Sequence, residues 1–508
     1  MDNNVSDDSL EALIQNCENE ALHLTGHIQP IGYMLVAEAE TLTIVAVSQN
    51  IASLLDMSVD SLLGSSLSML PGLPDRVLFT VGVAPGSRQH EWYRTMHGQQ
   101  VHIRSIRSAS HLVIEIEPVR SEQPAVVDLA SQIVLQPEEG EPWQDDDYWQ
   151  RLLNGLLDTL PFERAVLYRF AEDFSGEVVA EAALDGSQKY FGLKFPASDI
   201  PEIARKMYFE NPSRLIADVN GSPVPLVSHE DEPADLSWSD LRSVSPVHIR
   251  YLNNMGVVTS YSIPLIIAGR LWGLVSFHHS EALLPDARDR YDAEQLVKRF
   301  CGIYATFLSK RKLSMLRLFD DRMAGILSQM TLFDDAAAAN RFFLNELMMW
   351  FDASATALVV NDTWYLSEHA GPMLNDIQKI DSVYRRDVSD FLLTTQNIAG
   401  LPELTTVTKP ACRGMLTIRV NYERHSPRLY VFRPPESQVT HWAGKPEKVI
   451  DTERGALSPR NSFAKWEQVK GNESLPWLSS DTLFAKKIRV GMVQLVNNAF
   501  EGWGVSRE

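Results

Sequence analysis

Few residues of this sequence have a type and spacing that could do chemistry. His278 and His279 form an adjacent pair, and the cysteines are Cys17, Cys301 and Cys412. Successive side chains on a strand point to opposite faces, so the two histidines are poorly placed to bind one metal ion. The cysteines lack metal-site spacing, and the sequence contains no GxSxG turn, HExxH helix, Walker loop, kinase signature or EF-hand loop. This pattern favours a binding or sensing protein over an enzyme.

Cys17 is the cysteine that lies nearest to a chain terminus, among Asn16, Glu18 and Glu20. Neighbouring carboxylates disfavour the thiolate, so nothing in the local sequence makes Cys17 a strong nucleophile. A reaction at this sulfur would depend on a docked ligand that holds its reacting group within attack distance. The alternative is an inert thiol.

Three blocks of strands and helices must position these residues. In the first block, period-2 alternation predicts strands with one buried face and a short helix. The strands span 32–39, 42–48, 101–107 and 111–119, and the helix spans 50–57. This block is expected to form a small α+β sensor-type domain.

The second block opens with a helix, because Trp149 and several leucines between 149 and 160 recur at helical spacing on one face. Strands are predicted at 164–170, 177–184, 260–267 and 271–278. The long connection 185–259 is expected to be functional, since compact domains rarely contain loops of that length.

The third block begins with a long predicted helix over 288–331. Its apolar residues follow heptad spacing, which fits a dimer seam or a stripe packed on its own domain equally well. They are Leu296, Phe300, Ile303, Phe307, Leu316, Phe319, Met323, Ile326 and Met330.

Strands are predicted near 355–367, 415–421 and 428–433, and an amphipathic helix over 481–500. The intervening segment 438–478 lacks clean periodicity but contains Trp442, Trp466 and Trp477. A loop this rich in tryptophan is expected to cover or contact another part of the protein.

The composition excludes several classes of protein. The 508 residues carry 46 Lys and Arg against 66 Asp and Glu, a net charge of −20 with no long basic block, which disfavours nucleic-acid and membrane-surface binding. The apolar runs are far shorter than the roughly 20 residues of a membrane helix. The acidic N-terminus does not resemble a secretory signal, and three cysteines are too few for a disulfide framework. We therefore expect a cytoplasmic protein with free thiols.

Several blocks, taken in order, resemble the photosensory module of bacterial phytochromes. They are Cys17 with HLTGHIQPIG (23–32), PASDIP (196–201) with ARKMYFENPSRLIADV (204–219), DLSWSDLRSVSPVHIRYLNNMGV (235–257), GRLWGLVSFHH (269–279) and PRNSF (459–463). The resemblance covers nearly the whole chain. It implies an α+β protein with PAS, GAF and PHY domains, a long connecting helix, and a figure-of-eight knot between the segment near Ile28 and a loop from 185–259.

The resemblance also implies domain boundaries. They are an N-terminal segment 1–30, a PAS domain 31–120, a linker 121–143, a chromophore-binding GAF domain 144–310, a connecting helix 311–335, a PHY domain 336–480 with a tongue over 438–478, and an output helix 481–508.

The cofactor implied by the resemblance is a linear tetrapyrrole, biliverdin IXα, attached as a thioether to Cys17. Plant and cyanobacterial relatives attach a different bilin through a cysteine near this position. This sequence has His248 there and not a cysteine, which favours biliverdin. Asp199 would lie beside the pyrrole nitrogens, His278 would donate to the ring D carbonyl, and two arginines would bind the propionates. The implied chromophore-binding residues are Tyr168, Phe195, Asp199, Ile200, Pro201, Tyr208, Arg214, Arg242, Ser245, His248, Tyr251, Ser260, Ser262 and His278.

Each of these residues also has an ordinary structural explanation. Tyr168 could belong to the core, and His248 could be a hydrogen-bonded buried histidine. Arg214 and Arg242 could form weak surface ion pairs. Asp199 could cap the helix that follows it, since a first-turn proline suits that position.

The implied function is that of a red/far-red photoreceptor. Z/E photoisomerisation would rotate ring D and break a dark-state ion pair between Arg460 and Asp199. Ser462 would then be the alternative partner in place of Arg460. The tongue would then refold between hairpin and helix. Within this chain no enzyme is expected. Expected partners are a second copy and a C-terminal effector, either a diguanylate cyclase or a histidine kinase, or a response regulator.

Two other functions stay open at this point. One is a PAS/GAF sensor of a small metabolite or cyclic nucleotide without photochemistry, and the other, ranked last, is a bilin reductase. The sequence also departs from the family at Ile31, where histidine is frequent, and at Ala443, where glycine is common. Spectral tuning and thermal reversion are therefore not predicted.

Overall fold

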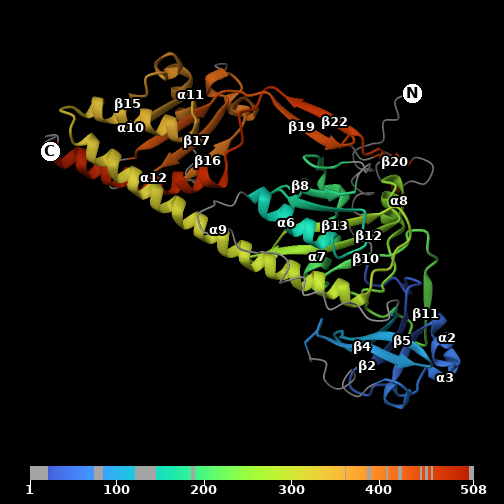
Figure 1. Cartoon of the computed structure of the whole chain (residues 1–508). Coiled ribbons are helices and arrows are strands. Elements are labelled where there is room, and N and C mark those ends of the chain that lie inside the picture. The colour runs from blue at the N-terminus through green and yellow to red at the C-terminus, as the bar shows by residue number, and fades with distance from the viewer. Residues whose placement is uncertain are drawn as a thin grey trace. The chain divides into compact units, whose positions relative to one another are not determined.

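The computed structural model describes residues 21–73, 84–119, 145–184, 189–360, 362–385, 391–407, 410–421, 426–446, 449–451, 456–458 and 462–502. The chain divides into two units, one of Met1–Thr306 with His441–Trp466 and one of Phe307–Thr440 with Glu467–Glu508. Figure 1 traces both along the chain. None of the helices in these described ranges is long and apolar enough to cross a membrane.

The N-terminal part of the first unit is a seven-stranded sheet in the order β1-β11-β3-β2-β6-β5-β4. Its strands are β1 (His27–Ile28), β2 (Tyr33–Glu38), β3 (Ile44–Ser48), β4 (Arg88–Met96), β5 (Gln99–Arg107), β6 (His111–Pro118) and β11 (Val224–Ser228). The short helices α2 (Ala52–Leu55) and α3 (Val59–Leu62) follow β3. The four predicted strands are confirmed, whereas β4 was missed because its sequence RQHEWYRTM has no apolar alternation.

The prediction of one buried face is wrong for this sheet. On β6, Ile114 and Ile116 are buried on one face, yet Glu115 and Glu117 on the other face are only 1% and 3% exposed. Glu115 accepts a hydrogen bond from the backbone N–H of Leu241, in the long segment that follows β11. That segment therefore covers the face that sequence alternation assigned to solvent.

A second sheet in the same unit follows the order β10-β12-β13-β7-β8-β9. Its strands are β7 (Arg164–Phe170), β8 (Gly176–Ala183), β9 (Lys194–Phe195), β10 (Arg214–Ile216), β12 (Thr259–Ile267) and β13 (Arg270–His279). The predicted first helix is α6 (Asp145–Leu157), which packs along β7 and β8. The connection 185–259 contains two further helices, α7 (Glu202–Glu210) and α8 (Pro246–Asn254).

Part of the tryptophan-rich segment also belongs to this unit. The segment contains β19 (Gln438–Ala443), the paired strands β20 (Val449–Asp451) and β21 (Ala456–Ser458), and β22 (Lys465–Lys470), and its residues His441–Trp466 lie in this unit. Trp442 of β19 pairs in parallel with Lys194 of β9. The strands were not predicted because β19 and β22 are short and carry little buried apolar surface. The expected contact with another part of the protein is confirmed.

The second unit is built on the sheet β15-β14-β18-β17-β16. Its strands are β14 (Ala355–Val360), β15 (Thr363–Leu366), β16 (Leu392–Thr395), β17 (Gly414–Arg419) and β18 (Arg428–Arg433), with helices α10 (Ala336–Trp350), α11 (Leu374–Tyr384) and α12 (Ser479–Gly502). Leu429 and Val431 of β18 pack in one apolar cluster and Tyr430 and Phe432 in another, so both faces of the sheet are buried. The predicted hairpin is confirmed as β17 and β18.

The long predicted helix is α9 (Ala287–Met330). Phe319, Met323, Ile326 and Met330 are at most 7% exposed and pack against residues of α10 and α12. Leu296 and Phe300 are buried in the first unit. These six heptad positions therefore pack on their own domains, whereas Ile303, Phe307 and Leu316 are only half-buried, so a dimer seam along the helix stays a prediction. The expectation of a homodimer itself stays a prediction.

Candidate functional site

A cavity of about 490 Å³ opens in the first unit beside the second sheet. Strands β7, β8, β12 and β13 contribute to its walls, together with α7, α8 and the turn before α7. The structure brings all of the predicted chromophore-binding residues to this one cavity, which spacing alone could not have shown. The lining includes Tyr168, Phe195, Asp199, Ile200, Pro201, Tyr208, Arg214, Arg242, Ser245, His248, Tyr251, Ser260, Ser262 and His278.

Aromatic side chains form part of the cavity wall. The rings of Tyr168 and Phe195 meet edge to face at a centroid distance of 5.8 Å, and His248 stacks on Tyr251 at 5.9 Å. Tyr168 has its place because Gly176 on β8 lacks a side chain, since a Cβ there would lie 1.7 Å from Cζ of Tyr168. The wall suits a flat, conjugated ligand.

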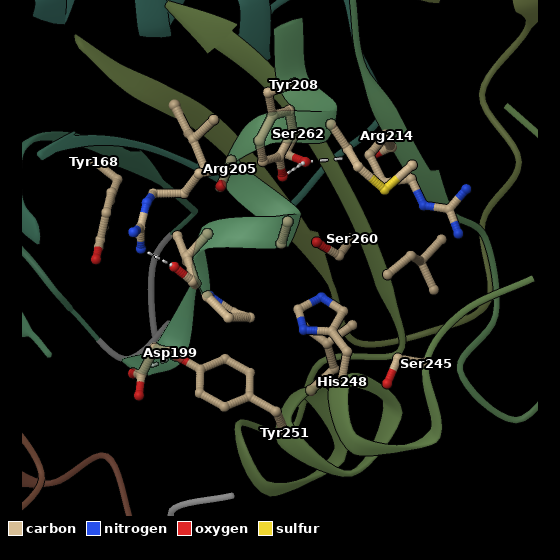
Figure 2. Close-up of a pocket in the computed structure, with 18 of the residues that line it drawn as sticks. Tyr168, Asp199, Arg205, Tyr208, Arg214, Ser245, His248, Tyr251, Ser260 and Ser262 are labelled. Atoms are coloured by element: carbon tan, nitrogen blue, oxygen red, sulfur yellow. Dashed lines mark hydrogen bonds between the residues drawn. The ribbon is translucent and has the colours of Figure 1, made fainter. Parts of the chain in front are cut away.

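Asp199 lies in a short 3₁₀ turn, Ala197–Asp199, immediately before α7. Its carboxylate Oδ2 accepts a hydrogen bond from the hydroxyl of Tyr251 at 3.0 Å, and Figure 2 shows the two side chains next to each other. The N-cap of α7 is Pro201, so the alternative in which Asp199 caps this helix is wrong. Asp199 is therefore joined by its side chain to α8.

The two histidines of the cavity, buried His278 and half-buried His248, favour the neutral form. Burial, with a further contribution from Arg214, lowers the pKa of His248 to about 4. Burial also lowers the pKa of His278 to about 3, together with the charge of Arg164 and with His248. Nδ1 of His278 is buried and has no hydrogen-bond partner among the described residues. A neutral histidine with an unused ring nitrogen is suited to a polar ligand atom.

Arg214 and Arg242 are not surface ion pairs. Arg242 is 6% exposed, and burial together with the charge of Arg214 lowers its pKa to about 9. The Arg214 guanidinium donates to the carbonyl oxygens of Arg242 and Ser243 at 2.7 and 2.9 Å, and burial lowers its pKa as well. No described carboxylate lies within ion-pair distance of either guanidinium, although Asp240 acts on both and partly offsets the lowering of their pKa. The cavity therefore has positive charge available for an anionic ligand.

Hydroxyl groups line the side of the cavity near these arginines. The Tyr208 and Ser262 hydroxyls lie 2.8 Å apart and share a hydrogen bond, as Figure 2 shows. Ser260 and Ser262 are on the same face of β12, two residues apart. Ser245 also has a structural role, because its Oγ accepts from Val247 N and caps α8.

Some cavity residues escaped the sequence analysis. Arg205 of α7 donates to the carbonyl oxygen of Ile200 at 2.5 Å, and its guanidinium lies over the ring of Phe174. Ser276 lines the cavity two residues before His278 on β13. The signal for Ser276 was present, since residues two apart on a strand share a face.

Not every predicted site residue can be placed. Cys17 and Arg460 lie outside the described residues. Ser462 is described and exposed, and its Oγ accepts from the N–H of Ala464, so it does not line the cavity. Its neighbour Phe463 is buried and contacts the ring of Tyr251 edge to face at 5.1 Å.

The N-terminal segment reaches the same region. Leu22 lines the cavity, and β1 pairs with β11. Gln29 is buried, donates to the carbonyl oxygen of Leu215 and accepts from the N–H of Ala217. These bonds join the N-terminal segment to the strand that carries Arg214. The knot itself stays a prediction.

Comparison with family descriptions gives three matches in chain order. Residues 17–119 match the description "PAS fold", 146–305 "GAF domain" and 322–501 "Phytochrome region". Among curated proteins, a bacteriophytochrome of Pseudomonas aeruginosa is 32% identical over 96% of this chain and 67% of its own length. Cyanobacterial phytochrome B of Nostoc is 28% identical over 95% of this chain and 66% of its own length. The chain thus spans about two thirds of these relatives.

Solved structures agree with these matches. A bacteriophytochrome from R. palustris is 26% identical, with a TM-score of 0.79 over 95% of this chain and 99% of that structure. The Stigmatella aurantiaca phytochrome photosensory core module is 24% identical with the same TM-score, over 95% of this chain and 98% of its own, and shows the shared fold.

Proposed function

The chain belongs to the bacteriophytochrome family and is a photosensory module of PAS, GAF and PHY domains, and we propose that it binds biliverdin IXα and responds to red and far-red light. A bilin chromophore follows from the family. The choice of biliverdin, its attachment to Cys17 and the colours sensed are the proposed parts.

The residues of the cavity fit a linear tetrapyrrole. Such a ligand is flat and apolar, with pyrrole N–H groups at its centre and two propionates at its edge. The observation that carries the proposal is the half-buried Arg214 with the buried Arg242, neither of them in an ion pair with a described carboxylate, beside an aromatic-walled cavity of about 490 Å³. Guanidinium groups bind carboxylates with two parallel hydrogen bonds, and the Tyr208–Ser262 hydroxyls lie on the same side.

The protein's own groups would hold the ligand at three places. Arg214 and Arg242 would bind the propionates, and His278 would donate from one ring nitrogen to the carbonyl of the last pyrrole ring. When bound, the bilin supplies light absorption and rotation about one methine bridge. Asp199 and Tyr251 would respond to that rotation because they are hydrogen-bonded to each other at the cavity wall.

The tongue provides the proposed route out of the pocket. Phe463 packs on Tyr251, which in turn donates a hydrogen bond to Asp199. A change at Asp199 would therefore alter the contact between the tongue and the cavity wall. We place the dark-state partner of Asp199 at Arg460 and the alternative partner at Ser462. The tongue strands would then refold, and α9 and α12 would pass the change to a second copy and to an effector such as a diguanylate cyclase or histidine kinase.

The first experiment is an absorbance spectrum of the purified chain mixed with biliverdin. A red band that shifts to the far-red on illumination is the expected result. A chain that binds cyclic nucleotides or small metabolites but stays colourless with biliverdin would instead be a PAS/GAF metabolite sensor, and the photoreceptor proposal would be wrong.

The attachment site is tested with the Cys17→Ala variant. We expect the variant to bind biliverdin but to lose it on denaturation, whereas the wild type keeps its colour under the same conditions. Cys412→Ser is the matched control, because Cys412 is a buried cysteine in the second unit. Colour that stays with denatured Cys17→Ala would move the attachment site to another residue.

A further inference from the structure

A second, smaller cavity of about 160 Å³ adjoins the chromophore cavity. His278, Tyr190 and Met255 line both cavities, so these side chains form the shared wall. The remaining polar lining comes from Glu163 and Arg164 at the start of β7 and from His279 and Ser280 at the end of β13. A polar space of this size is large enough for several water molecules.

The outer end of this cavity carries a well-defined acceptor. The Glu163 carboxylate accepts hydrogen bonds from Ser280 Oγ at 2.7 Å and from Ser280 N at 3.0 Å. Its side chain is 34% exposed, and Nε2 of His279 lies 3.8 Å from Oε1. The Ser280 hydrogen bonds lower the pKa of Glu163, so it is ionised at neutral pH. The carboxylate therefore touches both the solvent and the cavity.

The inner end is His278. Its Nδ1 is buried without a partner among the described residues, although a buried ring nitrogen normally has one. The groups that face it are Arg164 of β7, Tyr190 of the segment before β9 and His248 of α8. They include no carboxylate, so a neutral imidazole is favoured, and a neutral imidazole can take a proton at one nitrogen while releasing one from the other.

We propose that this side cavity is a proton-exchange route between the bilin pocket and solvent, with His278 as the inner relay and Glu163 as the outer acceptor. In one transfer, His278 gives the proton of its pocket-side nitrogen to an acceptor in the bilin pocket and takes a proton at its other nitrogen from water in the side cavity. The Glu163 carboxylate accepts a proton from bulk solvent and passes it to that water. The imidazole is neutral before and after, and the return transfer restores its tautomer. The route rests on the proposed bilin function.

The test measures how fast the pyrrole N–H groups of bound biliverdin exchange with D₂O in the dark, followed by the N–H bending band in resonance Raman spectra after rapid mixing. Glu163→Gln keeps the shape of the acceptor and removes its basicity, and we expect exchange to slow by about tenfold or more. Ser280→Leu fills the cavity and is expected to slow it similarly. Glu177→Gln is the matched control, since this β8 carboxylate has 35% side-chain exposure and pairs with Arg169 outside the cavity.

The outcomes separate the two proposals. A wild-type chain that stays colourless with biliverdin refutes the bilin function and the route together. If the wild type becomes coloured with biliverdin but either cavity variant exchanges at the wild-type rate, the route is wrong and the bilin function still stands. Slower exchange in both variants, with the control at the wild-type rate, supports the route. The measured quantity in all three variants is the rate of N–H exchange in the dark, not the yield of photoconversion.

Discussion

Two clusters of buried charge in the first unit are built in opposite ways. In the first, Arg104 of β5 pairs with Glu115 at 2.8 Å, with Glu117 at 3.3 Å and with Asp240 at 2.7 Å. Arg290 of α9 also binds Glu117. In the second, at the chromophore cavity, Arg214 and Arg242 bond backbone carbonyl oxygens and pair with no described carboxylate.

The pKa values of the arginines record this difference. Burial alone would lower the pKa of Arg104, but Asp240, Glu115 and Glu117 raise it well above its usual value. For Arg242, burial and the charge of Arg214 together lower the pKa to about 9. Removing a buried cation that is paired with several anions leaves those anions uncompensated, whereas a buried cation with no paired anion costs stability until a ligand supplies one. Asp240 and Asp235 act on Arg242 only from a distance and raise its pKa less than burial lowers it. We therefore expect the first cluster to be structural and the second to bind an anionic ligand.

The largest expected effect is on the first cluster. Arg104→Met would leave Glu115, Glu117 and Asp240 buried without their shared cation, so we expect the free energy of unfolding to fall by about 3–5 kcal/mol. Denaturant unfolding of the chain without bilin measures it. Arg169→Met is the control, because the exposed Arg169–Glu177 pair is expected to contribute below about 1 kcal/mol. Equal losses in the two variants would contradict a structural role for the cluster.

The next effect concerns the pH dependence contributed by the cavity histidines. The pKa of His248 is about 4 in the folded chain and near 6.5 when unfolded, so the unfolded chain binds the extra proton first as the pH falls. The stability contributed by neutral His248 is thus present above pH 6.5 and is lost toward pH 4. Between pH 7 and 5 that loss is about 2 kcal/mol.

His248→Gln should remove this part of the pH dependence from chemical unfolding curves recorded at pH 7 and pH 5 without bilin. The exposed His229 offers a matched control, since His229→Gln leaves the cavity untouched. A wild-type pH dependence in His248→Gln would show that the histidine is not held neutral by the cavity.

The two clusters also differ in how far the sequence revealed them. The strands of the second sheet follow from apolar alternation, and the cavity residues follow from motifs such as PASDIP and SVSPVHIRYL that resemble a known family. The Arg104 cluster was missed because the alternating segment HLVIEIEPV placed Glu115 and Glu117 on the solvent side. Only the segment around Leu241, more than a hundred residues away in sequence, buries them. Long-range covering of this kind leaves no local signal.

The smallest expected effect on stability gives the sharpest contrast. Arg242→Met makes the same exchange as Arg104→Met but removes a cation that has no paired carboxylate, so we expect the unfolding free energy without bilin not to fall. It should rise by at most about 1 kcal/mol, because the lost hydrogen bond to Leu236 offsets part of the desolvation cost that is removed. Reversible biliverdin binding, measured by absorbance titration in the Cys17→Ala background, should weaken by about tenfold or more, because a charged hydrogen bond contributes about 1.5–3 kcal/mol. If Arg242→Met instead destabilises the chain as much as Arg104→Met and leaves the affinity unchanged, Arg242 is a structural cation and the distinction between the two clusters fails.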